Sequence, residues 1–230
     1  MKAVILAAGR GSRLGELTSK IPKCLIEFKS KTLLEHNLNN LRKLFSDSDI
    51  IIIGGYKYEL LNNFHPNLVF NDQWDSTNIM GSLMKISQDL LEEEFIVVYS
   101  DIYYDVSAIE SILSVDSPAV INLVKFREIW QSRFDDPLQD LETFRISSSG
   151  KFLEQIGGKP VTLSEIDGQF GGIFSMNPTT WKLVLGHVPN VKFLDTTTLL
   201  NECIKLGVSI EAVDYSEIWV EIDSANDLLS

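Results

Sequence analysis

A glycine-rich, basic segment near the start of the chain has the residue types needed to bind a phosphate-bearing ligand. Gly9 and Gly11 follow a short apolar run and let the backbone approach a ligand closely with positive φ angles. The N–H groups of such a turn can form an anion-binding concavity. Arg13 and Lys23 can neutralise the charge that develops around a reacting phosphorus. The segment predicts phosphate chemistry, although it lacks the Gly-Lys-Ser/Thr of a Walker P-loop and the third glycine of the dinucleotide fingerprint.

Acidic residues far apart in the chain could hold a divalent cation. Asp101 follows the apolar run 95–99, and a carboxylate there suits Mg²⁺, which takes one or two carboxylates together with substrate phosphates. Capping of a helix is the alternative role for Asp101. Near the other end of the chain, alternation places Trp219, Glu221 and Asp223 on one face of a strand.

The apolar pattern predicts the elements that position these residues. Strands are expected at residues 3–8, 50–53, 68–71 and 95–99, and helices at 32–45 and 76–91. This alternation is typical of an open α/β sheet. Ligands of such sheets bind at the carboxyl ends of the strands, where both the Gly9 loop and Asp101 lie. The position of the two motifs therefore favours catalysis.

The second half of the chain predicts further elements of the same sheet. Strands are expected at 119–124, 168–176 and 209–213, two short strands within 144–156, and helices at 178–185, 195–206 and 223–229. We expect one α/β domain over residues 1–230, with a single open, mixed and mostly parallel sheet flanked by helices. Its halves are 1–115, which carries the glycine loop, and 116–230, which adds a small substrate-binding lid.

Composition limits the partners and the compartment. The net charge of −12 argues against a nucleic-acid ligand, because a phosphate backbone demands a basic surface. Cys24 and Cys203 give no disulfide framework, which fits a reducing cytoplasm. Neither a signal peptide nor a bilayer-spanning run is expected. The sequence does not fix the oligomeric state, and a homodimer is compatible with it.

The N-terminal string resembles the signature of nucleotidyltransferases with a Rossmann-like fold, Ala-Ala-Gly-x-Gly-x-Arg-Leu followed by Pro-Lys. In this chain the signature ends at Leu14, and Pro22-Lys23 supplies the pair. The resemblance implies a nucleotide-diphospho-sugar transferase-like fold and a triphosphate bound by Arg13 and Lys23. It also implies backbone contacts to the base and ribose from Leu6, Ala7, Ala8, Gly9 and Gly11.

The same resemblance implies the metal site and part of the nucleotide site. Asp101 and Asp223 are expected to hold Mg²⁺, with Glu221 as the alternative second ligand. Asn78 and Ser82 lie in a segment similar to one that contacts the nucleotide at a helix start in these enzymes. Residues 1–115 are thus the expected nucleotide-binding half, and residues 116–230 the acceptor-binding half.

Three later motifs resemble the bacterial choline-phosphate cytidylyltransferase branch, which also contains enzymes for aminoethylphosphonate and glutamine phosphate. They are Trp130-x-x-Arg133 with the acidic run after it, residues 156–159, and residues 165–170. Gly158 and the run 170–172 depart from the branch pattern, so the acceptor stays open. The resemblance implies transfer of CMP from CTP to a small phosphorylated acceptor, with Mg²⁺-assisted in-line attack, pyrophosphate release and a role in cell-surface polysaccharide or capsule decoration.

Aromatic and polar residues of the second half form the expected acceptor site. Aromatic faces attract a quaternary ammonium group, so Trp130 and Trp219 are candidate cage walls, with Tyr215 or Phe170 as a further wall; ordinary packing is the alternative. Lys159 is expected to bind the acceptor phosphate, and Gln169 and Glu221 complete the set. Three alternatives remain: a sugar-1-phosphate nucleotidyltransferase, a non-catalytic nucleotide-sensing module and a dinucleotide-dependent oxidoreductase.

Overall fold

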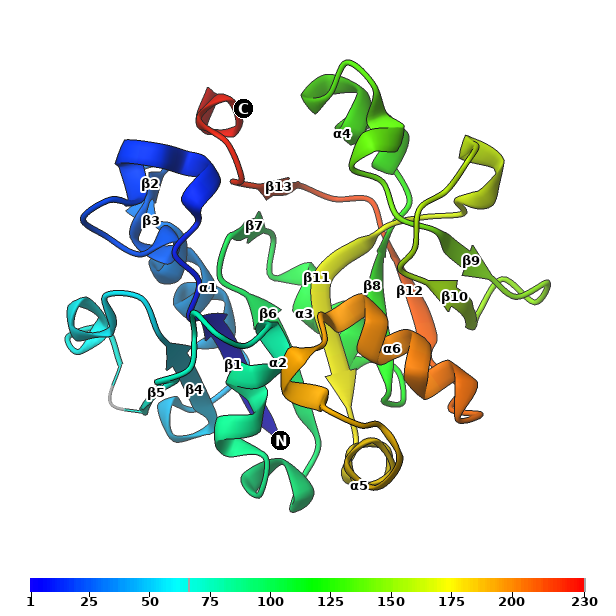
Figure 1. The fold of residues 1–230 in the computed structure, drawn as a ribbon, viewed down its shortest axis with the longest axis horizontal. Helices are drawn as coiled ribbons and strands as arrows, with labels where there is room; N and C mark the ends of the chain where they lie inside the picture. The colour runs from blue at the N-terminus through cyan, green and yellow to red at the C-terminus, as the bar shows by residue number, and fades with distance from the viewer. Residues whose placement is uncertain (66, 230) are drawn as a thin grey trace.

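A seven-stranded sheet with the order β12-β8-β11-β6-β1-β4-β5 forms the centre of the computed structural model, which describes residues 1–65 and 67–229 (Figure 1). Its strands are β1 (Lys2–Ala7), β4 (Ile50–Gly54), β5 (Leu68–Phe70), β6 (Phe95–Tyr99), β8 (Ala119–Leu123), β11 (Phe170–Met176) and β12 (Glu211–Tyr215). Every neighbouring pair is parallel except the two made by β11. The predicted mixed, mostly parallel sheet is confirmed.

The central strands end together at one edge of the sheet. Leu6 in β1 is paired with Ile53 in β4 and with Tyr99 in β6. Because the three strands are parallel, the loops that follow them meet at this edge. Their continuous apolar runs are buried by packing on both faces of the sheet.

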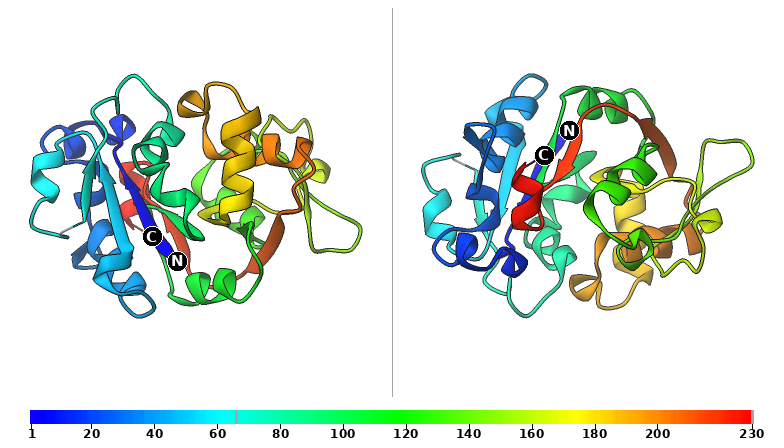
Figure 2. Two further views of the ribbon diagram at one scale, coloured as in Figure 1. Left: turned by 90° about the horizontal axis from the view of Figure 1, so that it is seen from below. Right: turned by 90° about the horizontal axis from the view of Figure 1, so that it is seen from above.

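Helices and short 3₁₀ turns connect and cover the strands. The α-helices are α1 (Leu33–Leu41), α2 (Ile79–Leu83), α3 (Ser107–Leu113), α4 (Phe126–Arg133), α5 (Pro178–His187) and α6 (Thr196–Lys205). Helix α2 packs against β1 and β4, and α3 packs against β8, β11 and β12. Figure 2 shows the blue-to-cyan N-terminal part and the lime-to-orange part of the chain lying side by side. In residues 1–65 and 67–229, every helix is too short or too polar to span a bilayer.

Small two-stranded sheets extend this framework. They are β2 (Glu27–Phe28) with β3 (Lys31–Thr32), β7 (Ile102–Tyr104) with β13 (Trp219–Glu221), and β9 (Phe144–Ile146) with β10 (Leu153–Ile156). In the second pair Glu221 lies opposite Ile102, and the Ile222 amide donates to the carbonyl of Asp101 at 3.0 Å. This pairing returns the C-terminal segment to the end of β6.

Three of the predicted helices are longer than the structure has them. The helix expected at 32–45 is α1, which ends at Leu41. Residues 76–91 form only α2, followed by 3₁₀ turns at Met84–Ile86 and Asp89–Leu91, where Ser87 and Asp89 have low helix propensity. Residues 223–229 form only a 3₁₀ helix, Ala225–Leu229. Asp223 therefore lies outside both the strand and the helix that were expected to hold it.

Candidate active site

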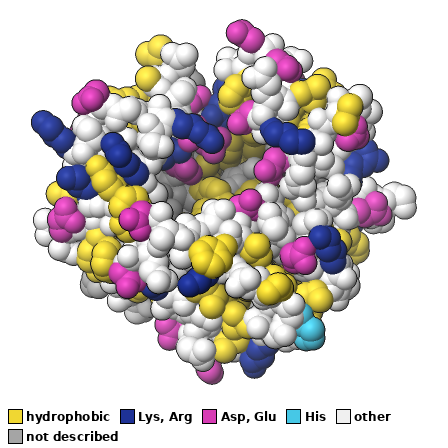
Figure 3. Space-filling model, in the orientation of Figure 1, with side chains coloured by type: hydrophobic (Ala, Val, Ile, Leu, Met, Phe, Trp, Pro, Cys, Tyr) yellow, Lys and Arg dark blue, Asp and Glu magenta, His cyan; other side chains and the backbone are white. Residues whose placement is uncertain are grey.

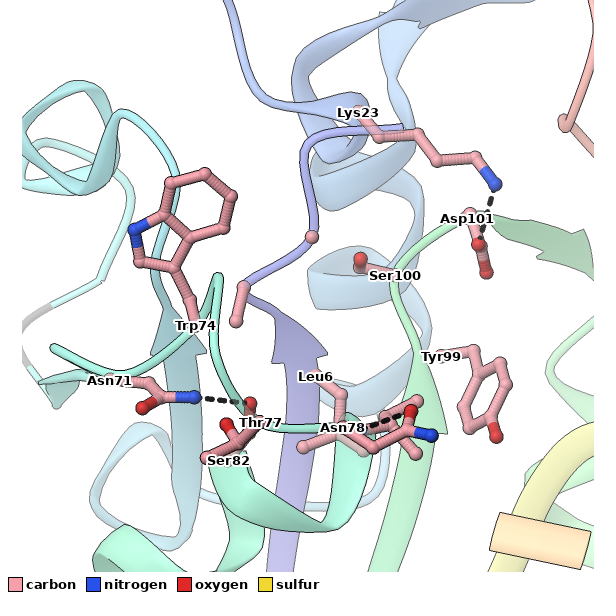
Figure 4. A pocket seen from close by; sticks show the side chains of 13 residues that line it. Leu6, Lys23, Asn71, Trp74, Thr77, Asn78, Ser82, Tyr99, Ser100 and Asp101 are labelled. Atoms are coloured by element: carbon pink, nitrogen blue, oxygen red, sulfur yellow. Dashed lines mark hydrogen bonds and ion pairs between the residues drawn. The ribbon is translucent and has the colours of Figure 1, made fainter. Parts of the chain in front are cut away.

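A cavity of about 280 Å³ opens at the carboxyl ends of β1 and β6. Of the residues expected to bind nucleotide, Leu6, Ala8, Gly9, Asn78 and Ser82 line it, whereas Ala7 and Gly11 do not. Figure 4 shows Lys23 and Asp101 together at one end of this cavity and the Trp74 indole on a separate wall. Most of the residues that were predicted to bind the nucleotide therefore line the same cavity.

Trp74 forms one wall of this cavity and was not among the site residues predicted from the sequence. Its side chain passes so close to Gly55 that a Cβ there would lie 2.4 Å from the Trp74 Cβ. Tyr56 packs edge-on against the indole at 5.3 Å between ring centroids. The indole is held firmly enough to offer a flat aromatic surface to a nucleotide base. The Gly54-Gly55 pair at the end of β4 was the available signal, because adjacent glycines permit close packing.

Gly11 lets Lys23 reach the cavity. Gly11 has φ 73°, and a Cβ there would lie 2.8 Å from the Cβ of Lys23 and 2.9 Å from its Cγ and Cδ. Lys23 begins a 3₁₀ turn after Pro22, which is extended. The lysine stem therefore crosses directly over the glycine, and the amine reaches the end of β6.

We expect Gly11→Ala to lower kcat/KM for the nucleotide at least about tenfold, because the added methyl group displaces the lysine. Gly15→Ala is the matched control: Gly15 also has positive φ, at 54°, but a Cβ there would meet no atom within 4 Å. Both variants place an alanine at positive φ, and the strain is greater at Gly15, whose ψ of −118° lies outside the left-handed helical region, so the control carries at least the strain of Gly11→Ala without its clash. Equal activity of the two variants in a pyrophosphate-release assay would contradict this role of Gly11.

Two carboxylates and two basic side chains meet at the mouth of the cavity. Lys23 Nζ donates to Asp101 Oδ2 at 2.7 Å and to Asp223 Oδ1 at 2.5 Å. Arg13 forms an ion pair with the other oxygen of Asp223. Burial alone would lower the pKa of Lys23, but Asp101 and Asp223 outweigh burial and raise it. The structure thus brings together the predicted triphosphate-binding cations and the predicted metal ligands.

The two carboxylates fit a magnesium ion. Asp101 Oδ1 is buried and has no hydrogen-bond partner among the described residues, so one lone-pair-rich atom is left for a ligand. Asp101 and Asp223 already converge on a single cation, the Lys23 amine. The described part of the chain contains no cluster of three or more His, Cys, Asp or Glu residues suited to a metal. A pair of carboxylates matches an ion that completes its shell with water and substrate phosphates.

A second cavity of about 240 Å³ lies on the other side of Tyr99, whose ring borders both spaces. It brings together four of the residues expected to bind the acceptor: Trp130, Gln169, Trp219 and Glu221. Figure 3 shows the hollow in this face of the molecule, with acidic side chains on its walls and basic ones around its rim. The structure thus contains two adjoining cavities that share Tyr99.

The two tryptophans stack on each other rather than face each other across a gap. Their ring centroids are 5.9 Å apart and their planes differ by 15°. Trp130 Nε1 donates to Asp140, and Trp219 Nε1 donates to the carbonyl of Gly171. Phe170 also lines the cavity. The aromatic wall is therefore a fixed stack, not two separate walls of a cage.

Carboxylates dominate this second cavity. Asp140, Glu142, Asp195 and Glu221 line it, and its lining within residues 1–65 and 67–229 includes no lysine or arginine. Burial raises the pKa of Glu142. Burial, and then the nearby Asp101, also raise the pKa of Glu221. Sequence analysis did not assign Glu142 or Asp195 to the acceptor site: Glu142 belongs to the acidic run after Trp130, whereas Asp195, the N-cap of α6, gave no such signal.

Two other predicted acceptor residues lie elsewhere. The Tyr215 hydroxyl donates to the carbonyl of Ile218 and accepts from the Asp105 amide, and its ring borders a different surface hollow. Lys159 is exposed and bonds the carbonyl of Gln139. Neither side chain lines the acceptor cavity, because each is bonded to backbone groups outside it, although Lys159 lies near enough to Glu142 to oppose the rise in the pKa of that carboxyl.

Comparison with known proteins decides the family. Residues 3–137 match the MobA-like NTP transferase domain, which is more than half of the chain. The chain belongs to this family. The match includes Lys23 and Asp101 and ends before the acidic segment near the C-terminus. The predicted enzyme class, a nucleotidyltransferase, is confirmed.

Individual relatives of this NTP transferase agree with the predicted branch. It is 26% identical to the CTP:phosphoglutamine cytidylyltransferase of Campylobacter jejuni, over 99% of this chain and 98% of the relative. A choline-phosphate cytidylyltransferase of Streptococcus pneumoniae is 39% identical over 39% of this chain and 41% of its own length. The inositol-1-phosphate CTP transferase of T. maritima superposes with a TM-score of 0.76 at 19% identity, over 98% of this chain and 90% of that one. The last likeness shows a shared fold.

Proposed function

We propose that the protein transfers CMP from CTP to a small phosphorylated or phosphonylated acceptor with a cationic end, releasing pyrophosphate. The cytidylyltransferase relatives support CTP as donor. The acidic and aromatic lining of the second cavity supports an acceptor with a cationic end, because carboxylates and aromatic faces both attract an ammonium group. A role in cell-surface polysaccharide or capsule decoration is part of the same proposal.

The charge of the second cavity separates the three candidate acceptors. Phosphocholine and aminoethylphosphonate carry only positive charge away from phosphorus. Glutamine phosphate, the substrate named for the Campylobacter relative, adds a carboxylate that no lysine or arginine lining this cavity would neutralise within the described residues. We therefore favour phosphocholine or aminoethylphosphonate, which lack a carboxylate, over an amino-acid phosphate such as glutamine phosphate.

The residues of the site support direct in-line transfer. Lys23 and Arg13 would neutralise the triphosphate as the acceptor's phosphate oxygen attacks the α-phosphorus. That oxygen is already ionised at neutral pH, so the chain need not supply a general base. Asp101 and Asp223 would hold Mg²⁺, which when bound withdraws charge from the phosphates. The remaining task of the protein is to hold the two substrates in line, one in each cavity.

Pyrophosphate release tests the function directly. Each of the four ribonucleoside triphosphates is combined with phosphocholine, aminoethylphosphonate, glutamine phosphate, inositol-1-phosphate and glucose-1-phosphate in the presence of Mg²⁺. Turnover with CTP and an ammonium-bearing acceptor supports the proposal. Turnover only with glucose-1-phosphate would identify a sugar-nucleotide enzyme. No turnover with any pair, together with nucleotide binding, would indicate the sensing module.

We expect Glu142→Gln to raise KM for an ammonium-bearing acceptor about tenfold, or ~1.4 kcal/mol, while KM for CTP is unchanged. The substitution keeps the shape of the side chain and removes one charge from the cavity wall. Glu165→Gln is the control, because Glu165 caps a surface 3₁₀ turn through Thr162. An unchanged acceptor KM in Glu142→Gln would exclude charge recognition by this residue.

A further inference from the structure

Arg133, the last residue of α4, is buried and forms ion pairs with two carboxylates. The proposed mechanism gives this arginine no role. Its side chain is 11% exposed. Nη1 donates to Glu221 Oε2 at 3.1 Å, and Nε donates to Asp227 Oδ1 at 3.0 Å. The guanidinium also lies over the Trp130 ring, 5.7 Å from its centroid. One cation thus joins the acceptor cavity to the C-terminal segment.

Asp227 continues this connection to the metal carboxylate. Its Oδ2 accepts from the amide of Asp223 at 3.0 Å, the amide of Ser224 at 2.6 Å and the hydroxyl of Ser224 at 2.9 Å. Asp227 is 8% exposed. These three bonds hold the backbone of Asp223 in place.

The arrangement exceeds what capping of a short helix requires. The same chain contains an ordinary capping carboxylate: Glu35 accepts from the amide and the hydroxyl of Thr32 at the start of α1. That site has the same two local bonds and is only partly buried. Asp227 adds a third donor from Asp223 and a buried arginine from another element. These additions join the metal carboxylate to the helix that carries Trp130.

We propose that Arg133 and Asp227 are positioning residues that fix Asp223 for metal binding and tie it to the acceptor cavity. The proposal rests on the proposed function, in which Asp223 holds the ion. Arg133 acts on the site through its bond to Glu221, and Asp227 acts through its bond to the Asp223 amide. Partners that orient a metal-binding carboxylate commonly affect metal affinity or activity by about 10–100-fold.

Asp227→Asn is the primary test. An asparagine can accept from the Asp223 and Ser224 amides with its oxygen, but its NH₂ group then faces the Nε–H of Arg133, and two donors repel. We expect half-saturation by Mg²⁺ to shift upward about tenfold and kcat to fall about tenfold or more. Binding of Mn²⁺ in the presence of CTP, measured from the electron paramagnetic resonance signal of the free ion, should weaken by a similar factor.

Two further variants keep the test decisive. Glu35→Gln weakens a comparable cap far from the site and should lose thermal stability without changing Mg²⁺ half-saturation or Mn²⁺ binding. Arg133→Lys keeps the charge but cannot repeat the two-way geometry of the guanidinium, so it should weaken Mn²⁺ binding in the same direction. Because the pair acts as one unit, the double variant should lose less than the product of the two single losses.

The outcomes separate this proposal from the proposed function. If Asp223→Ala abolishes turnover while Asp227→Asn and Arg133→Lys keep wild-type Mg²⁺ half-saturation and Mn²⁺ binding, the positioning role is overturned and the metal site stands. If Asp223→Ala keeps wild-type turnover and Mn²⁺ binding, the metal assignment fails first. If Asp227→Asn does not fold, the Mn²⁺ affinity of Arg133→Lys decides the matter.

Discussion

Asp101→Asn should lower kcat by at least about a hundredfold and leave the fold intact, because a charged, preorganised ligand is lost where the transition-state charge develops. Asp101 lies in the turn that follows the buried strand β6, and one of its oxygens bonds Lys23 while the other is buried without a partner among the described residues. Asparagine keeps the shape but offers a single acceptor and no charge. The measurement is pyrophosphate release at saturating CTP, acceptor and Mg²⁺, with thermal unfolding followed in parallel.

Asp105→Asn provides the matched control for Asp101. Asp105 follows the adjoining strand β7 and accepts from the amide of Ser107, the first residue of α3, at 3.0 Å. It is exposed, so its loss should cost stability of about 1 kcal/mol and little activity. Retention of more than about a tenth of wild-type kcat by Asp101→Asn, which is under ~1.4 kcal/mol of barrier, would remove Asp101 from the metal site.

The strands of the central sheet were predictable because burial on both faces leaves a continuous apolar run. Residues 95–99 were predicted as a strand and are β6, and residues 50–53 make up most of β4. Such runs carry their signal in five or six consecutive residues and need no knowledge of distant partners. Residues 76–91 have apolar residues at helical spacing, but this spacing fits a short helix followed by 3₁₀ turns as well as one continuous helix, and there the structure differs from the prediction.

The candidate site was predictable where chemistry is tied to a motif and not where it depends on long-range pairing. Lys23 belongs to the Pro-Lys pair of the N-terminal signature, and Asp101 follows the apolar run 95–99. The structure places their side chains in contact. Asp223 was expected within a strand, but β13 ends at Glu221, and its place is set by the bond between the Ile222 amide and the Asp101 carbonyl. Pairings over such sequence distances follow from the whole fold, not from local spacing.

Lys23 occupies the position between the two carboxylates in which a metal ion would be held. Its Nζ lies 2.7 Å from Asp101 Oδ2 and 2.5 Å from Asp223 Oδ1, and the side chain is 10% exposed. A metal binding alone must displace this ammonium and leave it buried without a partner, which is costly. A metal arriving with a triphosphate offers the lysine new anionic partners. The geometry therefore predicts that nucleotide and metal bind with strong positive coupling, which is reciprocal by linkage.

Lys23→Met should separate the two roles of the lysine. We expect kcat to fall about 10²–10³-fold, because a positive group aimed at the developing charge is lost. Affinity for Mn²⁺ without nucleotide should instead rise, since Asp101 and Asp223 lose the cation that they share. The change is measured by Mn²⁺ titration with and without CTP: CTP should tighten Mn²⁺ binding at least about tenfold in the wild type, a coupling of ~1.4 kcal/mol, and much less in the variant. Lys20→Met, three residues earlier and exposed, should preserve both the coupling and the turnover. Weaker Mn²⁺ binding to Lys23→Met without nucleotide would show that the lysine organises the carboxylates for the metal rather than competing with it.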